Sequence, residues 1–475
     1  MSTTSKASQR IAALLDENSF VEIGALVTAR ATDFDLKQTE TPSDGVITGY
    51  GVIGGNLVYV YSQDASVLNG TVGEMHAKKI ANIYRLALKM GAPVIGLLDS
   101  AGLRLQESTD ALAAFGELYK RQSLASGVIP QITGVFGNCG GGLAILSAMS
   151  DFTFMEEKNG KLFVNSPNAL AGNTVAKCDT SAADYQCSKT SNVDITGSEA
   201  DILAQIRQLV SMLPANNEED AITDCTDDLN RVCAGLESCV GDTSVALSLI
   251  ADNNLFLEVK KEYAPEMVTG FLKLDGVTVG AVANCAERLD SEGKVAEKFD
   301  TTLSANGCEK AAEFVNFCDA FNIPVLSLTN TTGFKACECN EKRIAKAVAQ
   351  LTYAFANATV PKVNAVIGKA YGSAYVAMNS KATGADITIA WPNAEIGCMD
   401  ATLAAKIMYE GQGAETIKEK ASEYAALQNS VTSAAKRGYV DQIVEPADTR
   451  KYIIGAFEML FTKKEDRPAK KHGTV

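Results

Sequence analysis

The decapeptide GNCGGGLAIL, residues 137–146, follows VIPQITGVF, a run of apolar and β-branched residues. Such a run predicts a buried strand, and the small apolar residues after the glycines predict the start of a helix. Glycine costs roughly 0.5–1 kcal/mol relative to alanine inside regular structure. The consecutive glycines 140–142 therefore indicate either close backbone packing at a strand–helix turn or backbone N–H groups that meet a ligand.

The chain contains the same arrangement twice. Matching pairs of segments follow one another in the same order: APVIGLLDSAGLRLQE (92–107) with IPVLSLTNTTGFKACE (323–338), VIPQITGVFGNCGGGLA (128–144) with TVPKVNAVIGKAYGSAY (359–375), and SPNA (166–169) with WPNA (391–394). Such ordered self-similarity indicates duplicated structural units.

Prolines fix the register of the repeat. Pro93 and Pro130 are 37 positions apart, as are Pro324 and Pro361. We therefore predict two homologous domains, residues 1–235 and 240–475, connected by the polar segment 214–230.

Each copy has the same order of expected elements. A hairpin-like strand pair precedes an amphipathic helix, an apolar strand, a second helix, a second apolar strand and the glycine turn. Strands that alternate with helices and are almost continuously apolar predict an α/β fold with largely buried sheets.

Composition narrows the function classes. The 475 residues carry a formal charge of −14, which argues against a nucleic-acid-binding protein. No apolar run reaches about 18 residues, and the N-terminus lacks the apolar core of a secretory signal, so we expect a cytoplasmic protein.

The metal-ligating and nucleophilic residue types are few or badly spaced. The only histidines are His76 and His472, and we expect His76 to be a packing residue of a helix. The twelve cysteines contain no CxxC pair, since Cys337 and Cys339 are separated by one residue. We therefore expect no metal site, and reduced thiols that serve as small hydrophobic residues in a reducing cytosol.

The glycine turns, residues 137–143 and 368–374, present backbone N–H groups at the start of a helix. Such groups bind a phosphate or stabilise an oxyanion. No lysine follows either turn and neither turn carries GxGxxG, which excludes the P-loop and the dinucleotide fingerprint at these two places. Two equivalent turns favour a pair of oxyanion holes, with tight strand–helix packing as the alternative interpretation.

These residues resemble a known family. The first half carries GVITGYGVI, VYSQD, KKIANIYRLALKMGAPVIGLLDSAGLRLQE, SGVIPQITGVFGNCGGG and DFTFM, and the second FNIPVLSLTNTTGF, ATVPKVNAVIGKAYGSAYVAMNSK, ADITIAWPNAEIGCM and RPAKKHG. Over nearly the whole chain they are similar to the carboxyltransferase (β) subunits of biotin-dependent acyl-CoA carboxylases and decarboxylases, of the propionyl-CoA carboxylase and methylmalonyl-CoA decarboxylase type.

The resemblance implies an architecture and a reaction. Each half would have a crotonase-like fold of spiralled ββα units. The chain would form a hexamer, a trimer of dimers, with active sites between the N-half of one chain and the C-half of another. The reaction would move CO2 between N1 of biotin and the α-carbon of an acyl-CoA, through an enolate and a biotin oxyanion.

The resemblance also implies catalytic residues that act through backbone N–H groups. Gly141 and Gly142 of the N-half would hold the thioester oxygen. Ser373 and Ala374, next to Gly372, would hold the biotin carbonyl. The domain 1–235 would therefore be the acyl-CoA side and the domain 240–475 the biotin side.

Two loops, residues 64–74 and 100–104, are expected to form the CoA and acyl pocket. The substrate-binding candidates are Asn69, Gly70, Ala101, Gly102, Arg104, Lys79 and Val376. Lys78, Lys79 and Arg104 are candidate contacts for CoA phosphates, and ordinary surface charge is the alternative reading. Val376 would lie near the acyl group.

The chain departs from the family pattern at two places. Ser373 stands where the family has a second glycine, and the segment 166–192 lacks a Leu-Gly-Gly stretch that borders the acyl pocket. The acyl group is therefore open between the propionyl/methylmalonyl and acetyl/malonyl pairs.

Partners follow from what the sequence lacks. It has no AMKM biotin-attachment segment and no ATP-binding domain. We expect biotin to reside on a separate carrier protein. A further partner would be an ATP-dependent biotin carboxylase or a membrane decarboxylase that pumps Na⁺, which leaves the physiological direction open.

Two alternatives belong to other functional classes. Another crotonase-fold acyl-CoA enzyme, a hydratase or isomerase, needs a glutamate base, for which Glu107 and Glu338 are the candidates. A non-catalytic scaffold subunit would explain the turns by packing alone.

Overall fold

The computed structural model describes residues 5–30, 40–290 and 292–468. The chain divides into two compact units, Met1–Ala221 and Ile222–Val475. His472 and the end of the RPAKKHG motif lie outside the described residues.

The segment 222–235, assigned from sequence to the first domain, packs with the second unit. Ile222 forms an antiparallel bridge with Val277, and the Thr223 N–H donates to the Gly276 carbonyl at 3.0 Å. The Cys233 N–H donates to the Ala447 carbonyl at 2.8 Å. The division between the two units therefore lies within the polar segment 214–230 that was expected to connect the domains.

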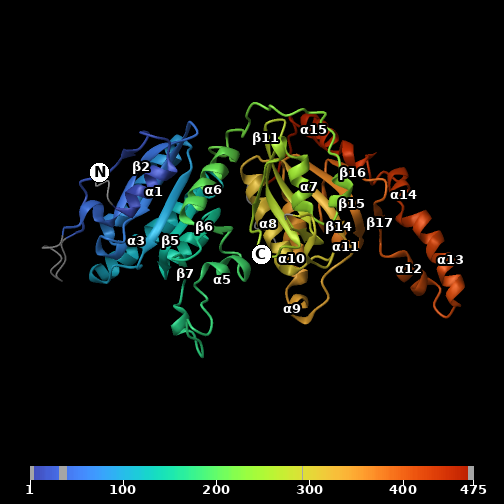
Figure 1. The fold of residues 1–475 in the computed structure, drawn as a ribbon, viewed down its shortest axis with the longest axis horizontal. Coiled ribbons are helices and arrows are strands. Elements are labelled where there is room, and N and C mark those ends of the chain that lie inside the picture. The colour runs from blue at the N-terminus through green and yellow to red at the C-terminus, as the bar shows by residue number, and fades with distance from the viewer. Residues whose placement is uncertain (1–4, 31–39, 291, 469–475) are drawn as a thin grey trace. The chain divides into compact units, whose positions relative to one another are not determined.

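The first unit is built on an eight-stranded sheet (Figure 1). Its order is β1-β2-β3-β4-β5-β6-β8, and β7 pairs with the end of β5. The first two pairings are antiparallel and the rest are parallel. The strands are β1 Val21–Glu22, β2 Val46–Ile53, β3 Asn56–Gln63, β4 Val94–Ser100, β5 Gln131–Gly140, β6 Phe152–Glu156, β7 Lys161–Phe163 and β8 Ile195–Gly197.

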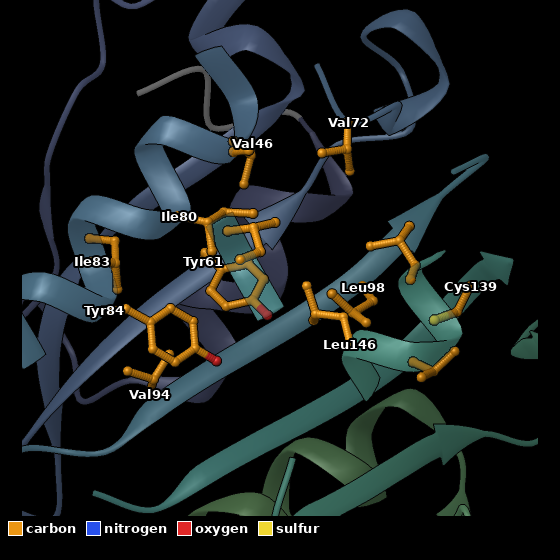
Figure 2. Packing of buried hydrophobic residues seen from close by; sticks show 14 of the residues in the cluster. Val46, Tyr61, Val72, Ile80, Ile83, Tyr84, Val94, Leu98, Cys139 and Leu146 are labelled. Atoms are coloured by element: carbon orange, nitrogen blue, oxygen red, sulfur yellow. The ribbon is translucent and has the colours of Figure 1, made fainter. Parts of the chain in front are cut away.

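Helices pack on this sheet through one apolar face. In α2, which ends at Gly91 in the left-handed conformation, Ile80, Ile83 and Tyr84 are buried. Figure 2 shows these side chains facing the sheet residues Tyr61 and Val94. The helices are α1 Lys6–Leu14, α2 Glu74–Met90, α3 Ser108–Ala125, α4 Gly142–Ala148, α5 Ala183–Ser188 and α6 Glu199–Met212.

The second unit repeats the sheet. Its order is β18-β16-β15-β14-β11-β10-β9, and β17 pairs with β15 as β7 pairs with β5. A separate hairpin, β12–β13, has no counterpart among the described strands of the first unit. The strands are β9 Phe256–Val259, β10 Met267–Leu274, β11 Val277–Asn284, β12 Glu287–Leu289, β13 Val295–Lys298, β14 Val325–Thr331, β15 Lys362–Tyr371, β16 Ile387–Ala390, β17 Glu395–Gly397 and β18 Gln442–Ile443.

The helices of the second unit include equivalents of α2, α3 and α4, which are α8, α10 and α11. Beyond β17 the chain continues into α12 to α15 (Figure 1). The helices are α7 Thr243–Ile250, α8 Ala305–Ala320, α9 Glu338–Glu341, α10 Ile344–Asn357, α11 Gly372–Ala377, α12 Ala401–Met408, α13 Ala414–Tyr424, α14 Val431–Lys436 and α15 Thr449–Met459.

The repeat extends to strand register. Val94 of β4 is opposite Gln131 of β5, and Val325 of β14 is opposite Lys362 of β15. Each pairing then shifts register at the carboxyl end, before Ser100 in one unit and before Thr331 in the other. Both glycine turns therefore leave their sheets at the same position. Among the described residues, no helix combines the length and hydropathy needed to cross a membrane.

Candidate active site

The turn of the first unit depends on Gly141. Its φ is +60° and its ψ −123°, a conformation that side chains disfavour. The Gly141 N–H donates to the Phe163 carbonyl of β7 at 2.9 Å, so it already has a partner. The first N–H groups of a helix have no intrahelical acceptor, and in α4 these belong to Gly142 and Leu143.

The turn of the second unit also has a glycine with positive φ at the start of a helix. Gly372 has a φ of +61°, and α11 begins there. Counted from the repeated prolines, Gly141 corresponds to Gly372, so Gly142 and Leu143 correspond to Ser373 and Ala374. The pair Gly141–Gly142 named from sequence is therefore one residue out of register with the pair Ser373–Ala374. The proline spacing of the repeat could have aligned Gly142 and Leu143 with Ser373 and Ala374. The hydrogen bond from Gly141 to Phe163 could not be predicted from the sequence.

Close packing explains Gly142 but not Gly141. A Cβ atom on Gly142 would lie 2.8 Å from the Tyr119 hydroxyl and 3.1 Å from the Phe115 ring. The Tyr119 hydroxyl donates to the Gly142 carbonyl at 2.8 Å. A Cβ on Gly141 would meet nothing within 4 Å. The backbone conformation, not contact, is what requires glycine at 141.

The loops 64–74 and 100–104 lie together beside this turn. The Ala101 N–H donates to the Asn69 carbonyl at 3.0 Å, and the Val72 N–H donates to the Gly102 carbonyl at 2.8 Å. A Cβ on Gly70 would lie 2.4 Å from the Asp99 carbonyl, and one on Gly102 would lie 3.5 Å from the Gly140 carbonyl. Four of the expected substrate-binding residues, Asn69, Gly70, Ala101 and Gly102, are thus brought together next to the glycine turn.

Arg104 and Lys79 do not lie where a CoA phosphate could reach them. The Arg104 guanidinium is buried and pairs with Asp44 at 2.7 Å and Glu107 at 3.0 Å. The Lys79 ammonium is buried and donates to the Ser43 carbonyl at 2.9 Å and its hydroxyl at 2.7 Å. Their internal partners argue against the predicted phosphate contacts.

Lys78, the third candidate cation, is on the surface. It is 63% exposed and pairs with Glu74 at 2.6 Å.

A buried polar cluster that the sequence analysis missed supports these loops. The Nδ1 atom of His76 lies 2.9 Å from the Asp44 carbonyl, and its Nε2 atom lies 3.2 Å from the Gln63 amide nitrogen. Burial lowers the pKa of His76 to about 3. Burial also raises the pKa of Asp44, in spite of the neighbouring Arg104. His76 is a neutral packing residue, as expected, and no spacing in the sequence connects it to Asp44.

The glutamates of the hydratase alternative are unsuited to act as a base at the turns. The Glu107 side chain is fully buried and bound to Arg104. The Glu338 side chain is 87% exposed and pairs with Lys342 at 2.9 Å.

Val376 is 43% exposed on α11, and its equivalent on α4, Ile145, is also 43% exposed. Each short helix therefore presents one apolar side chain to its surroundings, close to the turn. Val376 stays a predicted contact for the acyl group.

A cavity of about 580 Å³ opens in the first unit beside the loop 64–74. Its lining includes Lys6, Arg10, Asp64, Ser66 and Asp99, and Lys6 is exposed.

Among the described residues, no three His, Cys, Asp or Glu side chains are arranged to hold a metal ion.

Comparisons with known proteins identify the family of this chain. Residues 4–475 match the model of the carboxyl transferase domain family. The chain is 38% identical over 490 residues to the methylmalonyl-CoA decarboxylase subunit alpha of Propionigenium modestum, covering 99% of this chain and 92% of that protein. It is 39% identical over 484 residues to the propionyl-CoA carboxylase beta chain of Roseobacter denitrificans, covering 99% and 93%.

The solved structure of transcarboxylase 12S, described as a hexamer with hydrolysed methylmalonyl-CoA bound, superposes with a TM-score of 0.91 at 36% identity, covering 98% of this chain and 92% of that one. The chain belongs to the carboxyl transferase family. The expected enzyme class is confirmed, as is the expected fold class, α/β with two homologous crotonase-like domains in tandem.

Proposed function

We propose that this chain moves CO2 between N1 of carboxybiotin on a separate carrier protein and the α-carbon of a short-chain acyl-CoA. The observation that carries the proposal is the pair of equivalent glycine turns, with φ of +60° at Gly141 and +61° at Gly372. Transfer between two carbonyl compounds needs two sites that stabilise an oxyanion, and the duplicated fold supplies two.

The first turn would hold the thioester oxygen with the N–H groups of Gly142 and Leu143. Hydrogen bonds from fixed backbone donors become stronger as the oxygen gains negative charge. One such donor lowers the activation free energy by about 3–4 kcal/mol. This interaction would stabilise the enolate that forms when the α-carbon gains or loses CO2.

The second turn would hold the biotin carbonyl with the N–H groups of Ser373 and Ala374. Two backbone N–H groups are uncharged hydrogen-bond donors, so they suit the neutral ureido oxygen of biotin. When bound, biotin carries the CO2 and supplies the base for the α-proton. The Ser373 side chain is exposed, so it narrows the approach without removing a donor.

The names of the relatives favour the propionyl-CoA and methylmalonyl-CoA pair over acetyl-CoA and malonyl-CoA. The decarboxylase subunit and the carboxylase chain are equally similar to this chain, at 38% and 39% identity. The transfer chemistry is the same in both directions. We propose that the partner sets the direction, a biotin carboxylase for synthesis or a Na⁺-pumping membrane decarboxylase for breakdown.

We further propose that the chain works as a hexamer in the cytoplasm, following the hexameric transcarboxylase 12S. In this assembly the domain on the acyl-CoA side would be the first unit and the domain on the biotin side the second.

Carboxyl transfer from methylmalonyl-CoA and malonyl-CoA to free biotin tests the proposal. We expect biotin-dependent loss of the carboxylate, faster with methylmalonyl-CoA. Gly141→Ala should lower the rate at least tenfold, because alanine disfavours a positive φ and would displace the Gly142 and Leu143 N–H groups. Gly54→Ala is the matched control: Gly54 has a φ of +55°, and a Cβ there also meets nothing within 4 Å.

Equal rates for Gly141→Ala and Gly54→Ala would remove the first turn from the reaction. Binding of CoA esters without any biotin-dependent transfer, by a folded oligomer, would favour a different acyl group. Failure to bind CoA esters at all would favour the scaffold alternative.

A further inference from the structure

Two cysteines lie next to each other on an exposed segment of the second unit. Cys337 comes just before α9, and Cys339 lies within it. Figure 1 labels this helix. Their Sγ atoms are 3.0 Å apart. A disulfide bond is about 2.05 Å long, so closing it requires a movement of only about 1 Å.

The segment is held at both ends, and both cysteines between the anchors are at least partly exposed. The Lys335 N–H donates to the Leu303 carbonyl at 2.9 Å. The buried Asn340 side chain donates to the Lys335 carbonyl at 2.7 Å and accepts from the Ala305 N–H at 2.7 Å. Between these anchors Cys339 is exposed and Cys337 partly exposed. The anchors keep the two sulfur atoms close, and solvent gives them room to move.

The chemical environment of this pair differs from that of the buried cysteines. Burial raises the pKa of Cys308 to about 12, which makes it inert at neutral pH. The hydrogen bond from Cys339 lowers the pKa of the Cys337 thiol, with help from the Asn340 N–H and the Lys335 charge. The same contact raises the pKa of Cys339. Cys337 is therefore the better thiolate, and Cys339 retains its proton.

We propose that Cys337 and Cys339 form a reversible dithiol–disulfide site that exchanges with low-molecular-weight disulfides such as oxidised glutathione. The Cys337 thiolate attacks one sulfur of the glutathione disulfide, forms a mixed disulfide and releases one glutathione thiolate. Cys339 then loses its proton to water, attacks the Cys337 sulfur and releases the second glutathione. The protein loses two electrons and two protons, and one glutathione disulfide becomes two glutathione molecules.

A single residue separates the cysteines, so the ring that closes is small and its disulfide strained. Strained, exposed disulfides are the labile ones that thiol buffers reduce readily. The site is therefore reduced in a reducing cytosol and oxidises when the disulfide fraction of the thiol pool rises.

The site can be followed in one peptide. Trypsin cleaves after Lys335 and Lys342 and releases ACECNEK, which contains both cysteines and no others. The native full-length protein is equilibrated with mixtures of reduced and oxidised glutathione, alkylated at acidic pH and digested. With increasing oxidised glutathione we expect this peptide to appear without alkyl groups, at a mass two hydrogens below that of the unalkylated dithiol peptide. After reduction and renewed alkylation it should carry two alkyl groups.

Single variants separate an internal disulfide from independent adducts. In Cys337→Ser and Cys339→Ser we expect the remaining cysteine to keep a glutathione adduct, since no second thiol resolves it. Cys178→Ser, at another exposed cysteine, should leave the yield of internal disulfide unchanged. Glutathione on both cysteines of the wild-type peptide, or two alkyl groups under conditions that already modify Cys178, would overturn the proposal.

Discussion

At the scale of single residues, the first unit contains charges that stabilise loops rather than bind ligands. Arg104 lies between the carboxylates of Asp44 and Glu107, and all three side chains are almost fully buried. It also donates to the Thr71 carbonyl at 2.6 Å. This cluster connects the segment before β2 to both loops beside the glycine turn, so its integrity is a condition for the site.

We predict that Arg104→Met lowers the free energy of unfolding by about 3–5 kcal/mol, because it leaves two buried carboxylates without their cation. Urea unfolding followed by circular dichroism measures the change. Arg85→Met should have little effect, because this arginine is exposed and its side chain donates to the neighbouring Asn82. Similar losses in both variants would contradict a special role for the buried cluster.

His76 makes the stability depend on pH. Its pKa is about 3 in the folded chain and 6.5 in a model peptide, so the unfolded chain binds the proton more strongly between these values. The stability that the neutral ring contributes is complete above pH 6.5 and is lost as the pH falls towards 3. Between pH 7 and pH 5 the loss amounts to about 2 kcal/mol.

We therefore predict that His76→Gln, which keeps one donor and one acceptor without titrating, removes about 2 kcal/mol of the loss between pH 7 and 5. Urea unfolding of both proteins at each pH measures the difference. Between pH 7 and 8 the two proteins should change in parallel, because His76 is then neutral in either state. Parallel curves down to pH 5 would show that His76 does not titrate on unfolding.

At the scale of elements, equivalent positions of the two turns have different surroundings. Gly142 faces α3, whereas Ser373 is exposed at the start of α11. The backbone follows the same path at both turns. The side chain at the equivalent position differs because Gly142 lies against α3 and Ser373 is exposed.

Exchanging the two residues tests this difference. Gly142→Ser should lower the unfolding free energy by about 1–3 kcal/mol, because its side chain would overpack against Phe115 and Tyr119. Ser373→Gly should change it by less than about 1 kcal/mol. Thermal unfolding of both variants measures the effects. Equal effects would mean that α3 moves to accommodate the serine side chain without a loss of unfolding free energy.

The same scale shows a second repeated device. Asp151 accepts from the Gln131 N–H at 2.7 Å, and Asp386 accepts from the Lys362 N–H at 2.8 Å. Each carboxylate thus caps the first residue of the strand that leads to a glycine turn. These contacts help to fix the register of β5 and β15, on which the position of the turn depends.

At the scale of the whole molecule, each unit has its own sheet and its own hydrophobic core. The chain between α6 and α7 has no helix or strand apart from a bridge at Ile222 and a short turn of 3-10 helix. Glu218 and Glu219 in this stretch are exposed.

We predict that a glutamate-specific protease, acting on the native protein, cleaves first at Glu218 or Glu219 and leaves two resistant fragments. Gel electrophoresis and intact mass measurement identify the cut. Prior cleavage within either unit would show that a segment of that unit opens more easily than the connection. Protection of both bonds would show that another chain or segment covers them in solution.

Much of the fold follows from the sequence alone, because glycine turns, apolar strands and proline spacing are local signals that occur twice. These signals determined the α/β class, the duplication and the strands that carry the turns. The resemblance of the same motifs led to the carboxyltransferase family. The resemblance also led to the prediction that the loops 64–74 and 100–104 form one pocket, and in the structure the two loops contact each other.

Only the tertiary structure decided which polar groups can bind a ligand and which already have a hydrogen-bond or ion-pair partner inside the fold. Arg104 and Lys79 look like surface cations in sequence, but the folded chain brings Asp44 to Arg104 and Ser43 to Lys79 from a distant segment before β2. The N–H of Gly141 is occupied because β7 adds a short pairing to β5, and three residues of strand leave almost no periodic signal. Side-chain and backbone partners far apart in the chain have no local pattern, so burial and hydrogen bonding had to be observed in the folded molecule.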